Sequence, residues 1–512
     1  MTYRKIWFDY VLWVVYAGLC IMLLAYTGNR LYASCVGTSL AGLGAFVLFP
    51  VLICLYTGIR LISQAIRKKH CFSAHFAALA ESLMVSVSFV FGTIIRIREG
   101  LLMASIYDSG SAFEPGDYYE LAVVRAGGWG MSFAHGMGDL YVRCLRIILS
   151  FLGNSVAAAM FFQVILQVAS MIFAYLAVRK AAGWLASCTM LLLLAFSSSF
   201  IHKIDVIDPE CLLIALFLAG LYLVISFVRA SVAGREIFGG WPGMFLLGAF
   251  LGLLSYLEGG CAVLFLFLTG LFTGKPVAGA GRKRRIGNLL IVLAGGGAGF
   301  FGSIAEDAAT SGVVFYQGLT WWLDTYLDLF AGAKMFGVIG TDYPFFVVLF
   351  LLASFVVFAF IMGGHEQDFS LWLLPCILVT PVFLIDFTVV GFGGVALFFW
   401  SAMAGLGLKG AVFGRQAVLM GEKDGKINVS TGPEPAVAVF EAPGPEAGDP
   451  AALSPASAAS TAGLQKKPRF IENPLPLPKK HVKREMDFDY KVLEADMHYD
   501  VEVDEEDDFD RF

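Results

Sequence analysis

The chain has 512 residues, of which 58% are hydrophobic and 15% are charged, and its formal net charge is -5. Its mean hydropathy of +0.74 excludes an ordinary soluble protein, because it reflects many uncharged runs of about 20 residues, each long enough to cross a bilayer. The small net charge says little about partners, and no nucleic acid is expected among them. The nine cysteines lack CxxC or CxxxC pairing, so the sequence indicates neither a zinc site nor a disulfide framework.

Uncharged runs between residues 10 and 408 predict an all-α membrane protein with about twelve transmembrane helices, in a range of about 10 to 13. Short juxtamembrane helices are also expected on the outer face. The expected spans are 10–28, 40–60, 82–104, 155–178, 184–201, 209–228, 241–257, 259–275, 286–305, 344–362, 370–386 and 388–408. The glycine-rich run 294–302 lies inside one span and indicates close helix packing rather than a phosphate-binding loop.

The distribution of charge predicts the orientation of the chain. If the N-terminus is cytoplasmic, most lysine and arginine residues between the spans fall on the inner side, as the positive-inside rule requires. They are Arg4, Lys5, Arg67, Lys68, Lys69, Arg179, Lys180, Arg229, Arg235, Lys275, Arg282, Lys283, Arg284 and Arg285. The outer side collects the acids Asp108, Glu114, Asp117, Glu120, Asp139, Asp205, Asp208, Glu210, Glu306, Asp307, Asp324, Asp328, Asp342 and Asp386. We therefore expect a multi-pass protein of the cell membrane with both termini in the cytoplasm.

Arg96 and Arg98 lie near the outer end of the third expected span, where an arginine is costly unless it snorkels or finds an anion. One interpretation is that they bind the phosphate of a lipid substrate. The other, of equal weight, is a pair between Arg96 and Glu99 on one helix face, with Arg98 reaching the interface.

The first large outer loop, residues 105–150, is the main candidate for chemistry. Its segment GDYYELA predicts a short helix that Asp117 caps, with the carboxylate beside the positive end of the helix dipole. An ionised carboxylate at the water boundary can accept a proton from a hydroxyl nucleophile, so Asp117 is the candidate catalytic base. Asp108 is the alternative base, and Glu120 lies one helical turn further on. The simpler interpretation is that Asp117 only caps the helix.

A second polar group is expected at the outer mouth between the fifth and sixth spans. His202 and Lys203 are candidates for phosphate binding, whereas Asp208 and Glu210 are interpreted as the acidic start of a helix. Glu258 stands between two apolar runs without a basic neighbour, and such an acid marks a site or a cavity by default. If the two short spans meet at the surface, Glu258 instead faces water.

After Leu408 the composition changes abruptly to that of a soluble tail, residues 409–512. Its first part is rich in Pro, Ala, Gly and Ser, which predicts a disordered cytoplasmic linker. The basic stretch 466–484 and the acidic terminus are interpreted as a solvated tail whose two halves attract one another. The alternative is a docking peptide for a cytoplasmic partner or a contact with anionic lipids.

Several motifs follow one another in an order that resembles a known family. A span is followed by DYYELA, GDLY, FLGN and a span ending in AVRKAAG, and then by LLLLAFSSSFI, DPECLLIALFLAGLYLVI and GAFLGLLSYLEGGCAVLFLF. Over residues 82–305 this order resembles the GT-C superfamily of membrane glycosyltransferases, especially the family 39-like branch with its dolichyl-phosphate-mannose mannosyltransferases. The chain differs from the family pattern at Tyr118, where an acid usually follows the aspartate, and at Glu258, where relatives often carry a lysine.

The resemblance implies an enzyme that transfers a hexosyl or pentosyl group from a polyprenyl-phosphate donor in the membrane. The acceptor would be a glycan, lipid or protein on the outer face, and the reaction an inverting displacement. Asp117 would be the base or a metal contact; a divalent metal ion is compatible with these acids, and no other cofactor is expected. The expected domains are an additional N-terminal pair of spans (1–80), a GT-C-like core (81–305), an aromatic outer loop with the last three spans (306–408) and the tail (409–512).

Two other classes of function stay open. A lipid or solute transporter is one, because twelve spans with cytoplasmic termini are typical of secondary transporters. A noncatalytic membrane scaffold whose tail recruits a cytoplasmic partner is the other.

Overall fold

The computed structural model describes residues 7–36, 43–68, 74–108, 117–124, 136–233, 240–273, 282–312, 314–320, 334–335, 342–361, 367–381, 385–386 and 393–413. Beyond Phe413 the expected cytoplasmic tail lies outside these residues, as does most of the expected aromatic loop. The described part is helical except for one pair of two-residue strands.

The helices in chain order are α1 (Trp7–Val36), α2 (Leu43–Lys68), α3 (Ala74–Asp108), α4 (Asp117–Val124), α5 (Met137–Leu152), α6 (Val156–Ala182), α7 (Trp184–Phe196), α8 (Ser198–Ile201), η2 (His202–Ile204), α9 (Glu210–Ala233), α10 (Trp241–Leu257), η3 (Gly259–Thr269), α11 (Gly270–Thr273), α12 (Arg282–Ser311), α14 (Tyr343–Ile361), α15 (Gln367–Val379) and α17 (Gly393–Phe413). The strands β1 (Lys334–Met335) and β2 (Ile385–Asp386) pair antiparallel, with Lys334 opposite Asp386.

Within the described ranges, eight helices are long and apolar enough to cross a membrane: α1, α2, α3, α6, α9, α12, α14 and α17. A ninth span results if α7 is joined with α8 and η2, which are bent by 67° against it. The other three of the expected spans fall on α10, η3 and α15, which have 17, 11 and 13 residues. These three are shorter than the roughly 20 residues that span a bilayer. The structure therefore confirms an all-α multi-pass membrane protein, with eight or nine helices of spanning length among the described residues rather than twelve.

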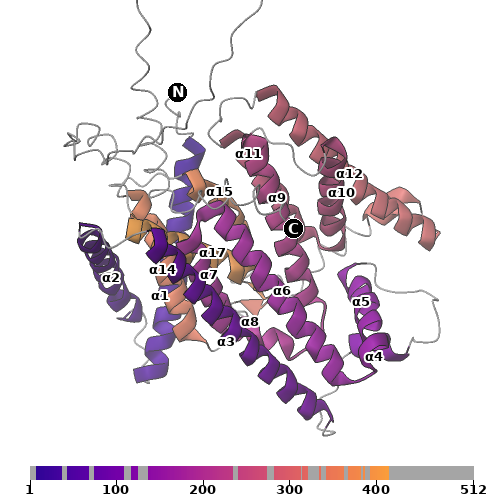
Figure 1. The fold of residues 1–512 in the computed structure, drawn as a ribbon, viewed down its shortest axis with the longest axis horizontal. Coiled ribbons are helices and arrows are strands. Elements are labelled where there is room, and N and C mark those ends of the chain that lie inside the picture. Colours follow the sequence, from indigo (N-terminus) through magenta and orange to yellow (C-terminus); the bar gives the residue numbers. More distant parts are fainter. Residues whose placement is uncertain are drawn as a thin grey trace, which may run out of the picture. The chain divides into compact units, whose positions relative to one another are not determined.

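The centre of the described bundle is formed by α6 and α17. α6 packs against α3, α7 and α9, and Figure 1 shows these helices running side by side. α17 packs against α7 and α14, and every side chain from Gly393 to Gly407 on it is buried. Trp400 of α17 stacks on Tyr16 of α1, with ring centroids 5.6 Å apart. These aromatic contacts tie the N-terminal helix to the last described one.

α12 packs closely against α10, and the glycine-rich run 294–302 on α12 had predicted close helix packing. A Cβ on Gly252 would lie 2.1 Å from the carbonyl oxygen of Gly296, and a Cβ on Gly299 would lie 2.2 Å from that of Ala249. Side chains at these positions would prevent the backbones from meeting, so glycine is required at this crossing.

One end of the bundle, here called the acidic end, is formed by the end of α3, the start of α6, η2 and the start of α9. The Tyr107 hydroxyl near the end of α3 donates to the carbonyl oxygen of Asp205 at 2.9 Å. Gln163 near the start of α6 donates from Nε2 to the carbonyl oxygen of Asp208 at 3.0 Å. These two bonds hold the end of α3 and the start of α6 against the segment that carries Asp205 and Asp208.

The opposite end of the bundle carries basic residues. Arg179 near the end of α6 pairs with Glu81 near the start of α3, with Nε and Oε1 2.6 Å apart. Lys180 lies over the ring of Tyr222 of α9, 5.4 Å from its centroid. Asp205, Asp208 and Glu210 therefore lie at the end of the bundle opposite to these basic residues.

Candidate functional site

α4 and α5 are two short helices that follow α3. α4 begins at Asp117, in agreement with the short helix expected there. The ring of Tyr118 on α4 stands perpendicular to that of Tyr141 on α5, with centroids 6.0 Å apart. Gly138 makes room for Tyr118, since a Cβ at this position would lie 3.0 Å from the tyrosine ring. The two short helices thus pack on each other through aromatic side chains.

The three candidate bases all lie near these short helices. Asp117 is the first residue of α4 and Asp108 is the last residue of α3, but both side chains lie outside what the structure describes. Glu120 is exposed on α4. The fold therefore places Asp117 and Asp108 at the ends of their helices. Of the three candidates, only Glu120 has a side chain whose surroundings are described.

A path of contacts leads from α4 to the start of α9. Tyr118 lies against Tyr141, and the hydroxyl of Tyr141 accepts a hydrogen bond from Gln163 Nε2 at 3.0 Å. The same Nε2 donates to the carbonyl oxygen of Asp208 at 3.0 Å. Gln163 is fully buried, so this path passes through the protein interior. It joins the helix that begins with Asp117 to the acidic end.

Arg96 is fully buried between α3, α6 and α7. Its Nη1 donates to the carbonyl oxygens of Gly92 and Ala195, both at 2.9 Å, and its Nη2 donates to that of Leu194 at 3.0 Å. Its Nε donates to Gln167 Oε1 at 2.8 Å. A buried guanidinium is tolerated when its donors are satisfied in this way.

Glu99, one of the two partners that the sequence suggested for Arg96, is not among these acceptors. None of the four hydrogen bonds goes to Glu99, so the expected pair with Arg96 on one helix face is not formed among the described residues. The guanidinium of Arg96 is enclosed by the protein, where its acceptors are carbonyl and amide oxygens. Arg98, two residues further on, is exposed.

Lys203 and Glu210 form an ion pair beside the start of α9. Lys203 Nζ lies 2.7 Å from Glu210 Oε2, and the Glu210 side chain is buried. Asp208 Oδ1 accepts the backbone N–H of Glu210 at 3.0 Å, so Asp208 caps the helix that begins at Glu210, as the sequence suggested. Burial raises the pKa of Asp208, while the Glu210 N–H and the charge of Lys203 oppose that rise. The ammonium of Lys203 is therefore engaged with an acid of its own chain.

His202, Asp205 and Glu99 come together at the edge of the acidic end. His202 Nδ1 lies 2.9 Å from Asp205 Oδ2 and 4.0 Å from Glu99 Oε1. His202 is exposed, whereas the two acids are partly buried. Burial raises the pKa of Asp205, the hydrogen bond from His202 lowers it, and the neighbouring charge of Glu99 raises it further.

Glu258 follows α10 as its C-terminal cap and stands apart from that cluster. Its own backbone N–H donates to the carbonyl oxygen of Leu254 at 2.9 Å. Burial raises the pKa of Glu258 to about 7, opposed by a hydrogen bond from the backbone N–H of Gly260. Gly136 before α5 approaches the same turn, since a Cβ there would lie 3.6 Å from the carbonyl oxygen of Leu257. The end of α10 therefore adjoins the short helices that follow α3.

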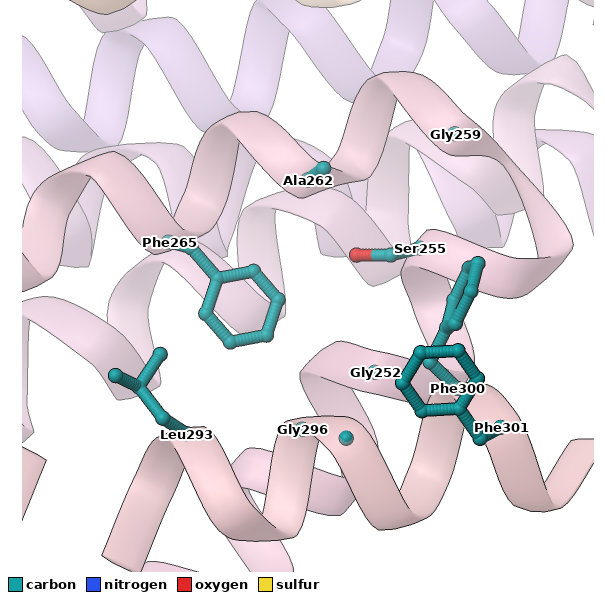
Figure 2. A pocket seen from close by; sticks show the side chains of 10 residues that line it. Gly252, Ser255, Gly259, Ala262, Phe265, Leu293, Gly296, Phe300 and Phe301 are labelled. Atoms are coloured by element: carbon teal, nitrogen blue, oxygen red, sulfur yellow. The ribbon is translucent and has the colours of Figure 1, made fainter. Parts of the chain in front are cut away.

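An apolar hollow of about 370 Å³ lies between α10, η3 and α12. Figure 2 shows Phe265 of η3 pointing into it, with Phe300 and Phe301 of α12 on one side. The lining also includes Ser255 and Gly259, the residues on either side of the turn with Glu258. A hollow with this lining suits a hydrocarbon chain rather than a polar ligand.

Three residues of the acidic end were missed in the sequence: Gln163, Gln167 and Tyr141. The two glutamines lie four residues apart in an apolar helix and therefore on one face, and polar residues inside a span often mark a functional or bonding role. The spacing of the two glutamines therefore indicated a polar contact inside the bundle. The contact of Tyr141 with Gln163 depends on how α5 packs on α6, so no local sequence pattern predicts it.

Length and hydropathy of the described helices define the class, which is a multi-pass α-helical membrane protein. Comparison with protein-family models, with curated proteins and with solved structures gives no match to this chain. Its activity has to be inferred from its own side chains.

Proposed function

We propose that this protein is a membrane glycosyltransferase of the GT-C type, which transfers a hexosyl or pentosyl group from a polyprenyl-phosphate donor to an acceptor. The observation that carries the proposal is the contact path from Tyr118 through Tyr141 and Gln163 to Asp208. It supports a shared site for the start of α4, where Asp117 stands, and the polar residues of η2 and α9. A carboxylate beside groups that can hold a phosphate is what such a transfer requires.

In the proposed orientation the acidic end faces the outside of the cell membrane and the end with Arg179 and Lys180 faces the cytoplasm. The positive-inside rule supports this choice, because the basic residues near the helix ends gather there. With an even number of crossings, both chain termini are then cytoplasmic. The acceptor, which would be a glycan, a lipid or a protein, meets the site from the outer side.

The proposed reaction is a single displacement at the anomeric carbon with inversion. Asp117 accepts the proton of the acceptor hydroxyl, and the acceptor oxygen forms the new bond to the anomeric carbon. The bond from that carbon to the phosphate oxygen breaks, and the polyprenyl phosphate leaves with the electron pair. Arg98 and His202, which are exposed at this end, can donate hydrogen bonds to the departing phosphate.

The apolar hollow between α10, η3 and α12 supports a lipid-linked donor. It begins beside Ser255 and Gly259, and the neighbouring turn adjoins Gly136 before α5. A prenyl chain lying in this hollow would have its phosphate near the outer end of α10. Glu258 stands at that turn and, with its raised pKa of about 7, can keep a proton near an anionic headgroup.

The experiment that tests the proposal measures transfer of radiolabelled sugar from a panel of polyprenyl-phosphate donors in membranes that contain the full chain. Wild type is compared with Asp117→Asn at matched expression. Asp139→Asn is the control, because Asp139 lies on α5 in a partly exposed i,i+4 pair with Arg143, a type of pair that contributes little to stability. We expect wild type and Asp139→Asn to transfer label, and Asp117→Asn to lose at least about a hundredfold, the usual effect of removing a catalytic base.

Each result has a definite meaning. Equal transfer by wild type and Asp117→Asn would remove Asp117 as the base, and the same assay on Asp108→Asn and Glu120→Gln would then identify it. No transfer from any donor by folded wild-type protein, together with equal lipid or solute flux in both variants, would contradict the transferase and favour a transporter.

A further inference from the structure

Glu99, His202 and Asp205 bring three metal-ligating side chains together from two distant segments. Glu99 comes from α3, whereas His202 and Asp205 lie in the turn at η2. One potential ligand atom from each residue lies within 4.8 Å of the other two. We propose that these three residues bind a divalent transition-metal ion.

The spacing of the three groups fits a metal site that needs only a small closure. Ligand atoms at about 2.1 Å from an octahedral ion are about 3 Å from one another. His202 Nδ1 and Asp205 Oδ2 already have this separation, at 2.9 Å. Glu99 Oε1 lies 4.0 Å from the same nitrogen, so a shift of its side chain by about 1 Å completes the geometry.

The negative charge of the cluster also favours the binding of a cation. Two carboxylates share one imidazole, and the guanidinium of Arg96, one turn before Glu99, is directed to carbonyl oxygens elsewhere. Asp205 Oδ1 is buried and has no hydrogen-bond partner among the described residues, although a buried carboxylate oxygen normally has one. A bound ion would neutralise the two acids together, and if the Asp205 carboxylate binds it through both oxygens, Oδ1 as well as Oδ2 gains a partner.

The segments that carry the ligands are held firmly against each other. The Tyr107 hydroxyl of α3 donates to the backbone carbonyl oxygen of Asp205 at 2.9 Å. Gly100, next to Glu99, lies against Ile204, whose Cγ2 would be 3.7 Å from a Cβ on that glycine. The backbone positions of the ligands are therefore set without the ion, which reduces the cost of binding it.

The ligand types select the ion and leave room around it. One imidazole with two carboxylates suits Mn²⁺ or Zn²⁺ better than Mg²⁺ or Ca²⁺, which prefer oxygen alone. Three protein ligands leave coordination positions for water or for an anionic oxygen. The His202 side chain is 61% exposed, so an ion can enter from water. This site does not depend on the proposed transferase activity.

The test measures Mn²⁺ uptake by the purified full chain in detergent, without a polyhistidine tag, from the loss of the free-ion signal in electron paramagnetic resonance. Wild type is compared with His202→Ala, Glu99→Gln and the control Asp139→Asn. The acidic run 501–510 supplies the same background binding in all variants. Beyond this background, we expect wild type and the control Asp139→Asn to bind one further Mn²⁺ per chain. His202→Ala and Glu99→Gln should bind this ion more than about ten-fold more weakly, because losing even a residue that only hydrogen-bonds to a metal ligand lowers metal affinity by that much.

A second readout identifies the ligand itself. In wild type the bound Mn²⁺ should show coupling to a nitrogen nucleus in pulsed spectroscopy, because His202 ligates it, and this coupling should be absent in His202→Ala. Wild type without nitrogen coupling, or equal uptake by wild type and Glu99→Gln, would overturn the proposal. If thermal unfolding shows that His202→Ala does not fold, the proposal is tested by the nitrogen coupling of wild type and by the Mn²⁺ affinity of Glu99→Gln.

Discussion

The guanidinium of Arg96 donates a hydrogen bond of 2.9 Å to the carbonyl oxygen of Ala195, just before the bend between α7 and α8. A bend of 67° deprives the last carbonyls of α7 of their helical donors, and the fully buried guanidinium of Arg96 supplies donors in their place. Arg96 also holds the carbonyl of Leu194. It therefore stabilises the break that directs η2 to the acidic end.

Replacing Arg96 with methionine should destabilise the fold strongly. The carbonyls of Leu194 and Ala195 and the amide of Gln167 would lose their donor in a buried place, and each bond to a charged group contributes about 1.5–3 kcal/mol. We expect a clear drop in the thermal unfolding temperature of the purified protein. Arg98→Met is the matched control, because Arg98 is exposed on the same helix. Similar unfolding temperatures for the two variants would contradict the role assigned to Arg96.

The crossing of α10 and α12 should tolerate no side chain at Gly252. Gly252→Ala would put a Cβ 2.1 Å from the carbonyl oxygen of Gly296, so the two backbones would have to separate. The expected loss is about 1–3 kcal/mol, the usual range for overpacking. Gly302→Ala on α12 is the control, because nothing lies within 4 Å of a Cβ there. Thermal unfolding of both variants in detergent measures the difference, and equal stability would show that the helices do not meet this closely.

The stability of the protein should depend on pH through Glu258. Its pKa is raised by burial to about 7, so the protonated form favours the folded state. This contribution is complete below the ordinary glutamate pKa of about 4.5 and is lost as pH rises through about 7. Glu258→Gln keeps a neutral side chain at every pH. We expect wild type and Glu258→Gln to unfold at similar temperatures at pH 5, and wild type to be the less stable at pH 8; a constant difference across this range would exclude the titration of Glu258.

The class of fold could be read from the sequence because each long apolar run carries its own signal. Lengths and composition alone indicated α1, α6, α9 and α14, and the glycines of 294–302 indicated close packing of their helix, though not that α10 is the partner. The sequence predicted twelve spans, which is more than the number of described helices long enough to cross a membrane. Apolar runs such as α10 and η3 resemble spans in composition even where the helix they form is too short. Hydropathy indicates how apolar a segment is, whereas the length of the helix it forms also depends on the segments that pack against it. Hydropathy alone therefore does not give the number of spans.

The candidate site was predicted only in part. The start of α4 at Asp117 and the helix start at Glu210 follow from local capping patterns, which act over a few residues. The contacts of Arg96 with Leu194 and Ala195 could not be predicted, because these two acceptors lie about a hundred residues away, at a bend that no local sequence pattern predicts. The same holds for Glu99, whose neighbours His202 and Asp205 become close only when α3 packs against η2.

The ion pair of Lys203 and Glu210 should show strong coupling between its members. Glu210 is almost fully buried, and Lys203 Nζ lies 2.7 Å from its Oε2. Lys203→Met leaves this acid without its cation, and removing one partner of a buried pair typically costs about 3–5 kcal/mol. Glu210→Gln in the same chain removes the uncompensated charge, so the double variant should regain much of the lost stability.

A double-mutant cycle of thermal or denaturant unfolding measures this coupling. Wild type, Lys203→Met, Glu210→Gln and the double variant are compared under one detergent condition, so that membrane-mimetic effects cancel. The expected order of stability has Lys203→Met lowest, with the double variant above it. If the two single losses simply add, the pair acts as an exposed surface contact, and Lys203 would be available to an external anion instead of being held by Glu210.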